Sequence, residues 1–361
     1  MPDVEMKDIT MRWGNVIAAE DVNLKIQDGE YVTILGPSGC GKTTLVRIIA
    51  GILKQTKGDV YIDGKDMADV PTEERDIGYV FQNIALFPHL DVLENVSYGP
   101  RVRDVQKPEW ERISHKYLGL VKLLDKMKMF PSELCGGEQQ KVSLARALST
   151  GARLLLLDEP LSALDARVRV DLRYELRRLV KSLGLTTLHV THDQEEAMSV
   201  SDRIVLMRSG RIVESDTPET MYMRPKSIFA AYFIGETNLL EGLIKKTDAA
   251  ATTVELRDGT LIEVATTDFR EGEPVVISVR PEYVYPAVTG IHAVVSSVTF
   301  VGTHFRIVAV ADTDDRVEFD VPATVEREYK KGDDVNLTID KRSAIVYART
   351  PGELGEATKL E

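Results

Sequence analysis

The sequence predicts two domains of different fold class: an α/β domain with a central sheet, followed by an all-β domain. Up to about Gly235, short apolar runs that are typical of buried parallel strands alternate with longer helical patterns. After this point, short β-branched runs are separated by turn signals, which is the pattern of an all-β barrel or sandwich. A chain of 361 residues, of which 43% are apolar, is long enough to bury the cores of two or three domains.

The first domain contains three apolar runs that predict buried strands, at residues 31–35, 154–157 and 187–190. Residues 167–182 have helical periodicity instead, with apolar side chains near one side and many arginines elsewhere. Continuous apolar runs of this kind are typical of parallel strands, so we expect a sheet that is covered on both faces.

The second domain shows the period and the turn signals of short strands. The strands are expected at residues 251–256, 261–264, 275–279, 293–300, 305–310, 317–321, 335–339 and 344–347. We place the domain boundary between Arg224 and Gly235, which gives domains at residues 1–235 and 236–361.

Composition and charge exclude several classes of protein. The net charge is −12, and residues 236–361 carry 14 basic and 23 acidic side chains, which is a poor match for a nucleic-acid backbone. The two cysteines, Cys40 and Cys135, exclude a disulfide framework and indicate a reducing compartment. No apolar run approaches the roughly 18 residues that a membrane span needs, and the acidic N-terminus shows no secretory signal. We therefore expect no transmembrane segment.

A motif of the type G-x-x-x-x-G-K-[ST] lies between the strand predicted at 31–35 and a helical run at 45–50. Its glycines let the backbone curl so that successive N–H groups point at phosphate oxygens, and the helix N-terminus adds a favourable dipole. In such loops the lysine, here Lys42, reaches the β- and γ-phosphates, and the hydroxyl of Thr43 ligates Mg²⁺. The candidate phosphate-binding residues are Gly36, Pro37, Ser38, Gly39, Cys40, Gly41, Lys42, Thr43 and Thr44. The motif alone leaves kinases, GTPases and many ATPases open.

Further motifs follow the loop in a fixed order. They are Gln82, Leu134-Cys135-Gly136-Gly137-Glu138-Gln139-Gln140, Asp158-Glu159, Ser162-Ala163-Leu164-Asp165 and Thr191-His192-Asp193. The ordered set closely resembles the ATP-binding cassette (ABC) ATPase family over roughly residues 4–235. The resemblance implies an α/β P-loop ATPase domain with a helical subdomain at about residues 83–148, and it implies ATP and Mg²⁺ as the bound groups.

The resemblance assigns the hydrolysis of ATP to Gln82, Glu159 and His192. Glu159 is expected to orient and deprotonate the attacking water, and His192 to hydrogen-bond the γ-phosphate and hold Glu159 in register. Gln82 is expected to touch Mg²⁺ and the water, and Asp158 to hold Mg²⁺ directly or through water. An apolar strand that ends in Asp158-Glu159 supports these roles, because it puts both carboxylates at the sheet edge where ligands bind in open α/β folds. No chemistry is expected of His89, His115, His189, His292 and His304.

The resemblance also implies a head-to-tail homodimer that holds two ATP molecules between its subunits. The signature segment, residues 134–140, is expected to bind the ATP held by the partner's loop, because its glycines allow close approach and the following helix starts with free N–H groups. The signature residues that would touch nucleotide are Cys135, Gly136, Gly137 and Glu138. Asp165 is expected to contact the opposite loop, and Trp13 to stack on adenine.

Both cysteines fall in these nucleotide motifs. Cys135 stands where the family usually has Ser, and a thiol is a weaker donor than a hydroxyl. We expect thiol reagents to inactivate the enzyme mainly through Cys40, with protection by ATP, and we expect Cys135→Ser to retain or raise turnover. Glu138 replaces the commoner Gln and changes the charge near phosphate.

Residues 236–361 resemble the OB-like C-terminal regulatory domain of importer ATPases. The matching features are Phe233-Ile234-Gly235-Glu236-Thr237-Asn238, Val279-Arg280-Pro281-Glu282 and Val301-Gly302-Thr303-His304. The nearest families are the ATPases of maltose/multiple-sugar, spermidine/putrescine and ferric-ion importers. This resemblance implies a peripheral subunit at the cytoplasmic face of the membrane, with two membrane-spanning permease subunits and an extracytoplasmic solute-binding protein. Residues 83–98 are expected to form the groove for a permease helix.

Two other functions compete with that of an importer ATPase. A soluble ABC ATPase that acts on nucleic acid or ribosomes is the main alternative, but such proteins carry two cassettes or a long coiled coil, and this chain has neither. A small-molecule kinase with the same loop is the third hypothesis, and the signature segment and His192 argue against it. We therefore predict an ATP-hydrolysing importer subunit with a sugar or polyamine as solute class and no nucleic-acid partner.

Overall fold

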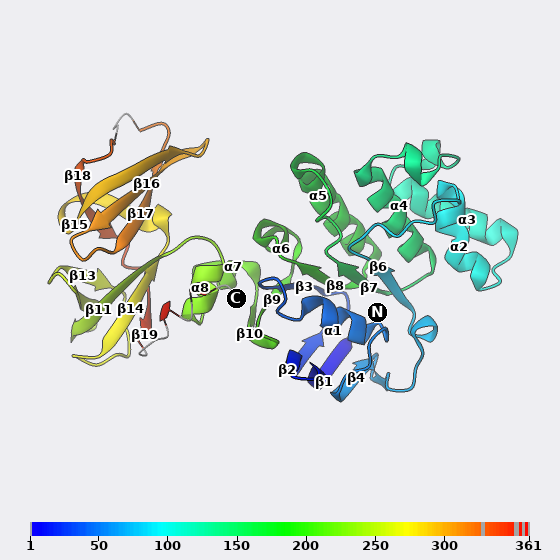
Figure 1. Cartoon of the computed structure of the whole chain (residues 1–361), viewed down its shortest axis with the longest axis horizontal. Helices are drawn as coiled ribbons and strands as arrows, with labels where there is room; N and C mark the ends of the chain where they lie inside the picture. The colour runs from blue at the N-terminus through cyan, green and yellow to red at the C-terminus, as the bar shows by residue number, and fades with distance from the viewer. Residues whose placement is uncertain (1, 326–328, 350–353, 356–357, 360–361) are drawn as a thin grey trace. The chain divides into compact units, whose positions relative to one another are not determined.

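The computed structural model describes residues 2–325, 329–349, 354–355 and 358–359. By internal contacts the chain divides into two compact units, Met1–Pro218 and Glu219–Leu360 (Figure 1). In the described residues, no helix combines the length and the apolar character that crossing a membrane requires.

The first unit is organised around a six-stranded sheet with the strand order β10-β9-β3-β8-β7-β6. The strands are β3 (Tyr31–Leu35), β6 (Ile77–Val80), β7 (Leu154–Asp158), β8 (Thr186–Thr191), β9 (Arg203–Arg208) and β10 (Arg211–Asp216). All neighbouring pairs are parallel except β9 and β10. Every residue of β3, β7 and β8 is buried, so the three predicted strands are confirmed together with the reason for their apolar runs.

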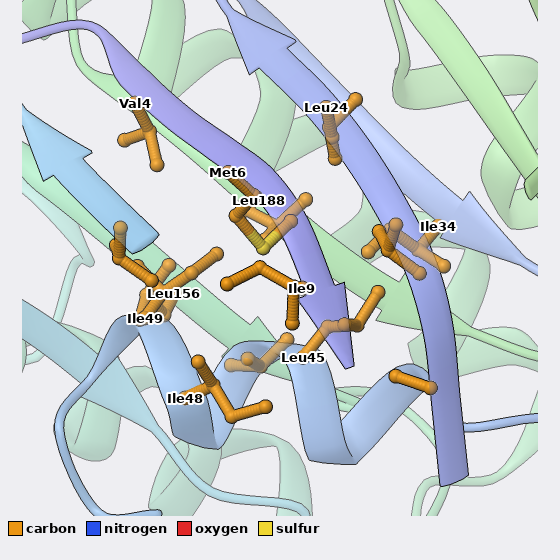
Figure 2. Packing of buried hydrophobic residues seen from close by; sticks show 14 of the residues in the cluster. Val4, Met6, Ile9, Leu24, Ile34, Leu45, Ile48, Ile49, Leu156 and Leu188 are labelled. Atoms are coloured by element: carbon orange, nitrogen blue, oxygen red, sulfur yellow. The ribbon is translucent and has the colours of Figure 1, made fainter. Parts of the chain in front are cut away.

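A second, antiparallel sheet of the same unit has the strand order β2-β1-β4-β5. Its strands are β1 (Val4–Trp13), β2 (Val16–Ile26), β4 (Lys57–Ile62) and β5 (Lys65–Asp66). Figure 2 shows Leu45 and Ile48 of helix α1 (Lys42–Ile49) beside Ile9 of β1. Leu156 of β7 and Leu188 of β8 belong to the same buried cluster. The helix that follows the phosphate-binding loop is therefore held by both sheets.

Three helices form a group between β6 and β7 in the sequence. They are α2 (Val92–Val102), α3 (Lys107–Leu120) and α4 (Gly136–Ser149), and they pack on one another around a shared core (Figure 1). Helix α2 begins at a capping box, in which Asp91 and Glu94 each accept a hydrogen bond from the other's backbone N–H. The group falls in the range that the sequence assigns to a helical subdomain. Helices α5 (Ala166–Leu183) and α6 (Gln194–Val200) follow β7 and β8, and α5 confirms the helix predicted at 167–182.

The second unit combines short helices with two antiparallel sheets that share one core. The helices are α7 (Pro218–Met223) and α8 (Ile228–Phe233). One sheet has the order β13-β12-β11-β14-β19, formed by β11 (Asn238–Thr247), β12 (Thr252–Leu256), β13 (Leu261–Val264), β14 (Pro274–Val279) and β19 (Ile345–Ala348). The other has the order β17-β16-β15-β18, formed by β15 (Val284–Phe300), β16 (His304–Ala311), β17 (Arg316–Pro322) and β18 (Asp334–Ile339).

All the runs predicted as strands in this unit overlap strands of the structure, but the sequence did not predict β11 or the first half of β15. Strand β11 carries two adjacent lysines and a glycine among its apolar residues, which obscures its period. The first half of β15 is interrupted by Pro286 and by Gly290, whose φ is 145°. The pairing with β18 shifts register between Pro286 and Ile291, so one bulged strand reads as two segments.

The sequence placed the domain boundary within residues 224–235, whereas contacts group the chain from Glu219 onward with the second unit. Arg280, which directly follows β14, donates hydrogen bonds to the carbonyl oxygens of Tyr222 at 3.0 Å and Ala231 at 2.7 Å. Helices α7 and α8 are thus tied to the β-rich unit by a side chain far along the chain, which no local pattern reveals.

Candidate functional site

The phosphate-binding loop lies between β3 and α1, as the motif predicts. Helix α1 begins at Lys42, whose side chain is 5% exposed. Its ammonium group donates hydrogen bonds to the carbonyl oxygens of Gly36 and Pro37, each at 2.8 Å. The loop therefore curls around a buried positive charge, the arrangement that attracts phosphate oxygens to such loops.

The glycines at both ends of the loop are required by packing as well as by backbone conformation. Gly41 has a φ of 102°, and a Cβ at this position would lie 1.9 Å from the carbonyl oxygen of Ala18. A Cβ on Gly36 would lie 2.3 Å from the carbonyl oxygen of Met207. Strands β2 and β9 thus press on the loop backbone. The middle of the loop is open to solvent, because Ser38 and Gly39 are exposed. Pro37, Thr43 and Thr44 are partly buried.

Thr43 and Asp158 meet beside the loop. The Thr43 hydroxyl donates a hydrogen bond to Asp158 Oδ1 at 2.8 Å, and Tyr79, which the sequence did not single out, donates to Asp158 Oδ2 at 3.1 Å. Burial, and then the charge of Asp158, raise the pKa of Tyr79, so its hydroxyl stays protonated. Hydroxyl and carboxylate oxygens are donors that Mg²⁺ accepts. Within the described residues, no three His, Cys, Asp or Glu side chains cluster to hold a metal, so Mg²⁺ here would also need phosphate and water oxygens.

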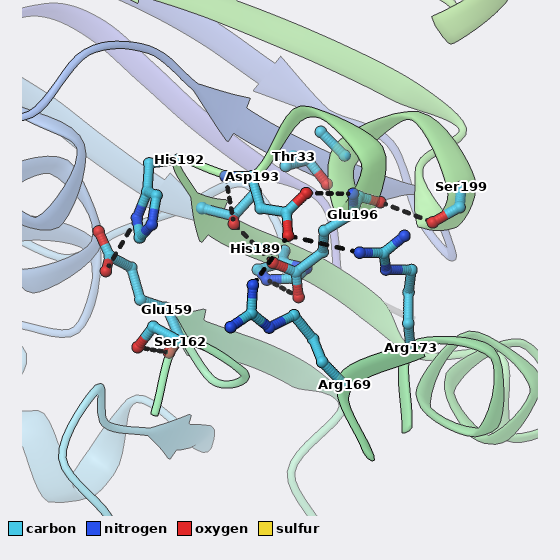
Figure 3. Close-up of polar contacts among 12 residues, drawn as sticks. Thr33, Glu159, Ser162, Arg169, Arg173, His189, His192, Asp193, Glu196 and Ser199 are labelled. Carbon is cyan, nitrogen blue, oxygen red and sulfur yellow. Dashed lines mark hydrogen bonds and ion pairs between the residues drawn. The ribbon is translucent and has the colours of Figure 1, made fainter. Parts of the chain in front are cut away.

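Gln82, Glu159 and His192 converge on one point although they lie far apart in the sequence. Gln82 Nε2 donates a hydrogen bond to Glu159 Oε2 at 2.9 Å. His192 Nδ1 lies 3.3 Å from the same oxygen (Figure 3). Glu159 has a φ of 46°, a backbone conformation that few residues other than glycine adopt. Its backbone N–H donates to Val190 O at 2.9 Å, so the turn brings the carboxylate to the end of β8, which His192 follows.

The signature segment enters a helix earlier than expected. The sequence predicts that a helix follows the signature segment, but α4 begins inside the segment, at Gly136, with Cys135 as its N-cap. The free N–H groups of the first turn therefore belong to the signature glycines themselves. A Cβ on Gly137 would lie 2.7 Å from Val168 Cγ1 of α5, so this glycine is also required for the packing of two helices.

Glu138 of the signature segment forms an ion pair with Lys126, another residue that the sequence did not single out. This hydrogen-bonded ion pair holds the pKa of Glu138 below its usual value. The Glu138 carboxylate also accepts a hydrogen bond from the backbone N–H of Cys135 at 3.2 Å. The negative charge that Glu138 adds to the segment is therefore balanced by a lysine from the connection between α3 and α4.

The remaining expected nucleotide contacts lie elsewhere on the first unit. Trp13, the last residue of β1, is 48% exposed rather than part of the core. Asp165 is the N-cap of α5 and accepts a hydrogen bond from the backbone N–H of Val168 at 3.1 Å. Within the described residues, no hydrogen bond or ion pair joins Trp13, Asp165 or residues 135–138 to the phosphate-binding loop. Their contacts with ATP remain predictions.

Comparison with known proteins decides the family. Residues 19–162 match the family described as ABC transporter, and residues 277–346 match the TOBE domain. The spermidine/putrescine import ATP-binding protein PotA of Rubrobacter xylanophilus is 44% identical over 306 residues, which cover 83% of this chain and 81% of that protein. The chain belongs to the ABC transporter family, among its import ATP-binding subunits.

Further relatives of this ABC subunit agree. The Fe(3+) ions import ATP-binding protein FbpC of Fusobacterium nucleatum is 38% identical over 352 residues, or 96% of this chain and 93% of that protein. The dimeric structure of a bacterial ABC transporter cassette matches 60% of this chain and 98% of that chain, with 33% identity and a TM-score of 0.54. The predicted family, the α/β ATPase fold with an OB-like second domain, and the activity of ATP hydrolysis coupled to import are confirmed.

Sequence reasoning missed a buried polar network beside His192 of this ABC subunit (Figure 3). Asp193 caps α6 by accepting a hydrogen bond from the backbone N–H of Glu196 at 2.9 Å. Glu196 is 2% exposed and accepts a hydrogen bond from Thr191 Oγ1 at 2.5 Å. The residues on both sides of His192 are thus fixed by one buried glutamate. The pattern Asp193-x-x-Glu196 at the start of a helix is the signal that could have revealed the cap.

Two arginines of α5 extend the same network toward the segment that contains Asp165. Arg169 and Arg173 each place a guanidinium nitrogen 3.4 Å from Asp193 Oδ2. Arg169 also donates to Leu164 O at 3.0 Å, in the segment that contains Asp165. His189, which is fully buried, lies 3.3 Å from Glu196 Oε1, and burial lowers its pKa, so it stays neutral and has a structural place in the network.

We expect Glu196→Gln to lower kcat about tenfold with little change in KM, because the amide keeps one acceptor but turns the other buried carboxylate oxygen into an N–H donor, which displaces His192 rather than the nucleotide. Steady-state phosphate release measures both constants. Glu195→Gln is the matched control, since the Glu195 side chain is 84% exposed and its 3.6 Å ion pair with Arg173 is open to solvent, so this variant should leave kcat nearly unchanged. In a His192→Ala background, Glu196→Gln should add little further loss. An equal loss in both backgrounds would show that Glu196 does not act through His192.

The two thiols of the protein differ in access, which bears on which of them a thiol reagent modifies first. Cys40 is 4% exposed and burial raises the pKa of its thiol, whereas Cys135 is exposed. Because the thiolate is the reactive form, we expect a maleimide at pH 7 to label Cys135 first. Labelling of Cys40 should increase as the pH rises toward its raised pKa. Mass spectrometry of the native protein measures both sites, and faster labelling of Cys40 at pH 7 would contradict the prediction.

Proposed function

We propose that the protein is the ATP-hydrolysing subunit of a binding-protein-dependent ABC importer, in which ATP-driven closure of a homodimer is coupled to solute uptake. The observation that carries the proposal is the convergence of Gln82 and His192 on the Glu159 carboxylate. The neighbouring residue in the chain, Asp158, is hydrogen-bonded to Thr43 of the phosphate-binding loop. A carboxylate held in this way next to a phosphate site is placed to activate a water for phosphoryl transfer.

The binding half of the mechanism rests on the loop and α1. The ammonium group of Lys42 is positioned by loop carbonyls and would exchange these partners for β- and γ-phosphate oxygens. Thr43 and Asp158 would hold Mg²⁺, which neutralises charge on the phosphates when it is bound. Tyr79 keeps the Asp158 carboxylate oriented by donating a hydrogen bond to its second oxygen.

The hydrolytic half rests on Glu159. Its carboxylate takes a proton from the attacking water as the water oxygen bonds to the γ-phosphorus and the bond to the ADP oxygen breaks. Gln82 and His192 hold Glu159 Oε2 from two sides, which limits rotation of the carboxylate. The products are ADP and phosphate, and the proton that Glu159 accepts returns to solvent.

A second copy of the chain completes each ATP site in the proposal. Cys135, Gly136, Gly137 and Glu138 would face the partner's loop, Asp165 would contact it, and Trp13 would stack on the adenine of its own subunit. The first turn of α4 supports this assignment, because its N–H groups are available to phosphate oxygens. The likeness to a dimeric ABC cassette also supports it.

We place the protein at the cytoplasmic face of the membrane, bound to two permease subunits and served by an extracytoplasmic solute-binding protein. Residues 83–98 would receive a permease helix. In this segment Phe87 and Tyr98 have ring centres 4.5 Å apart, and Tyr98 is 43% exposed, so an aromatic surface is available to a partner. Residues Pro88 and Leu90 lie in the same segment.

For the solute, the relatives favour a small cation. They include the spermidine/putrescine proteins PotA of Rubrobacter xylanophilus and Pseudomonas aeruginosa and the Fe(3+) protein FbpC of Fusobacterium nucleatum. We therefore propose a polyamine as the first candidate, ahead of the sugar class that the sequence left open.

The test is purification of the tagged chain from the membranes of its own cells in detergent. Two membrane subunits should co-purify, and the ATPase activity of the reconstituted complex should require Mg²⁺ and rise when the solute-binding protein is added with spermidine. Stimulation by ribosomes or RNA, together with consistent absence from membranes, would favour the alternative of a soluble ABC ATPase and overturn the proposal.

A further inference from the structure

Arg280 is a buried cation without an anionic partner. It stands in the motif Val279-Arg280-Pro281-Glu282 and is 5% exposed. Its guanidinium donates to three backbone carbonyl oxygens, of Tyr222 at 3.0 Å, Ala231 at 2.7 Å and Glu236 at 3.0 Å. Within the described residues, no carboxylate lies within ion-pair distance of it.

This arrangement leaves Arg280 without a direct ion pair. Carbonyl dipoles and the Tyr222 ring, whose centre is 4.4 Å from the guanidinium carbon, offset part of the cost of burial. The nearby carboxylate of Glu282 instead accepts a hydrogen bond from the Tyr222 hydroxyl at 2.7 Å. Burial lowers the pKa of Arg280, and the charge of nearby Glu282 opposes that shift only in part.

A cavity of about 540 Å³ in the second unit adjoins this guanidinium. Its wall is formed by α7 with the residues after it and by segments next to β14 and β19. The lining residues include three arginines, Arg224, Arg280 and Arg342, and one acidic residue, Glu219. In the part of the chain that the structure describes, the exposed guanidinium groups of Arg224 and Arg342 make no ion pair, although the charge of Arg342 acts on the nearby Asp340 carboxylate and lowers the pKa of Asp340 after two hydrogen bonds to it.

The arginines that line the cavity differ in their ion pairing from other arginines of the second unit. Residues 236–361 carry 23 acidic and 14 basic side chains, so carboxylates are abundant there. Other arginines have taken them as partners: Arg306 lies 2.7 Å from Asp320, and Arg316 lies 2.8 Å from Glu318. Arg224 and Arg342 instead line the cavity as exposed side chains, beside the buried Arg280.

We propose that this cavity binds a small anion that carries a phosphate group. Guanidinium groups present planar forks of donors that match phosphate oxygens, and the two exposed forks of Arg224 and Arg342, beside the buried positive charge of Arg280, favour a doubly charged anion over a carboxylate. The cavity is larger than a phosphate ion, so the structure assigns it to a phosphate monoester, with inorganic phosphate as the smaller ligand of the same chemistry. Such a ligand would link α7 to the β-sheets of the second unit.

The experiment is isothermal titration calorimetry on the full chain with inorganic phosphate and with glucose 6-phosphate as probes. Binding of either probe that persists unchanged in Arg342→Gln and Arg224→Gln is assigned to the phosphate-binding loop, so only the part of the binding that these variants weaken is assigned to the cavity. We expect the unmodified protein to bind at least one probe, and Arg342→Gln and Arg224→Gln each to weaken that binding about tenfold or more. Tighter binding of glucose 6-phosphate identifies a monoester site, and equal or tighter binding of phosphate identifies an inorganic phosphate site.

The matched control is Arg316→Gln, which removes an exposed arginine of the same unit outside the cavity and should leave affinity unchanged. Arg224 and Arg342 are exposed, so their replacement should not alter the melting temperature, which verifies that the variants are folded. Absence of binding of both probes at millimolar concentration would overturn the proposal. So would an equal loss of affinity in Arg316→Gln, which would indicate attraction to net charge only.

Discussion

Glu159→Gln is expected to lower ATP turnover about 10²–10⁴-fold while leaving ATP binding intact. Glutamine has the shape of glutamate, and its amide oxygen still accepts the hydrogen bond from Gln82, but it does not take a proton from water. Phosphate release at saturating Mg-ATP measures turnover, and equilibrium dialysis with labelled ATP measures binding. If turnover and ATP binding fall together, Glu159 contributes to nucleotide binding rather than to activation of the attacking water.

The same variant tests the proposed dimer. Because hydrolysis would reset the closed state, Glu159→Gln protein with ATP should elute as a dimer in size-exclusion chromatography, and protein with ADP should not. Glu195→Gln, on the exposed side of α6, should hydrolyse ATP normally and show no ATP-dependent dimer. If Glu159→Gln protein binds ATP fully but remains a monomer in solution and in its membrane complex, the shared site is excluded.

The sequence predicts well those site residues that lie directly beside a strand or helix with a recognisable apolar pattern. The loop around Lys42 needs a strand before it and a helix after it, and both are visible as apolar runs in adjacent residues. Glu159 and His192 each directly follow an apolar strand, so their position at one sheet edge follows from the parallel order of β7 and β8. The resemblance to the ABC family then supplied their roles.

The parts that the sequence did not predict depend on contacts between distant segments. Tyr79 reaches Asp158 because β6 and β7 are neighbours, and nothing in its own strand marks it. Lys126 balances Glu138 only after α4 is packed. The low access of Cys40 comes from the loop's burial between sheets, which no local pattern around Cys40 reveals.

Gly41→Ala is expected to destabilise the first unit by roughly 3 kcal/mol or more and to abolish measurable ATP binding. An alanine at a φ of 102° is strained by about 1–2 kcal/mol, and its Cβ would lie 1.9 Å from the carbonyl oxygen of Ala18. The clash is with the backbone of β2, so the loop itself has to move. Both tryptophans, Trp13 and Trp110, lie in the first unit, so tryptophan fluorescence during urea unfolding reports on that unit alone.

Gly39→Ala separates the two causes, because Gly39 has a φ of 79° but a Cβ there would meet nothing within 4 Å. This control should lose only the 1–2 kcal/mol that the backbone conformation costs. The difference between the two variants then measures how firmly β2 presses on the start of α1. Equal losses would mean that the loop yields to the Ala18 carbonyl without cost. In that case Gly41 would be required for its backbone conformation alone, and the close packing of strand and loop would contribute nothing to the shape of the phosphate site.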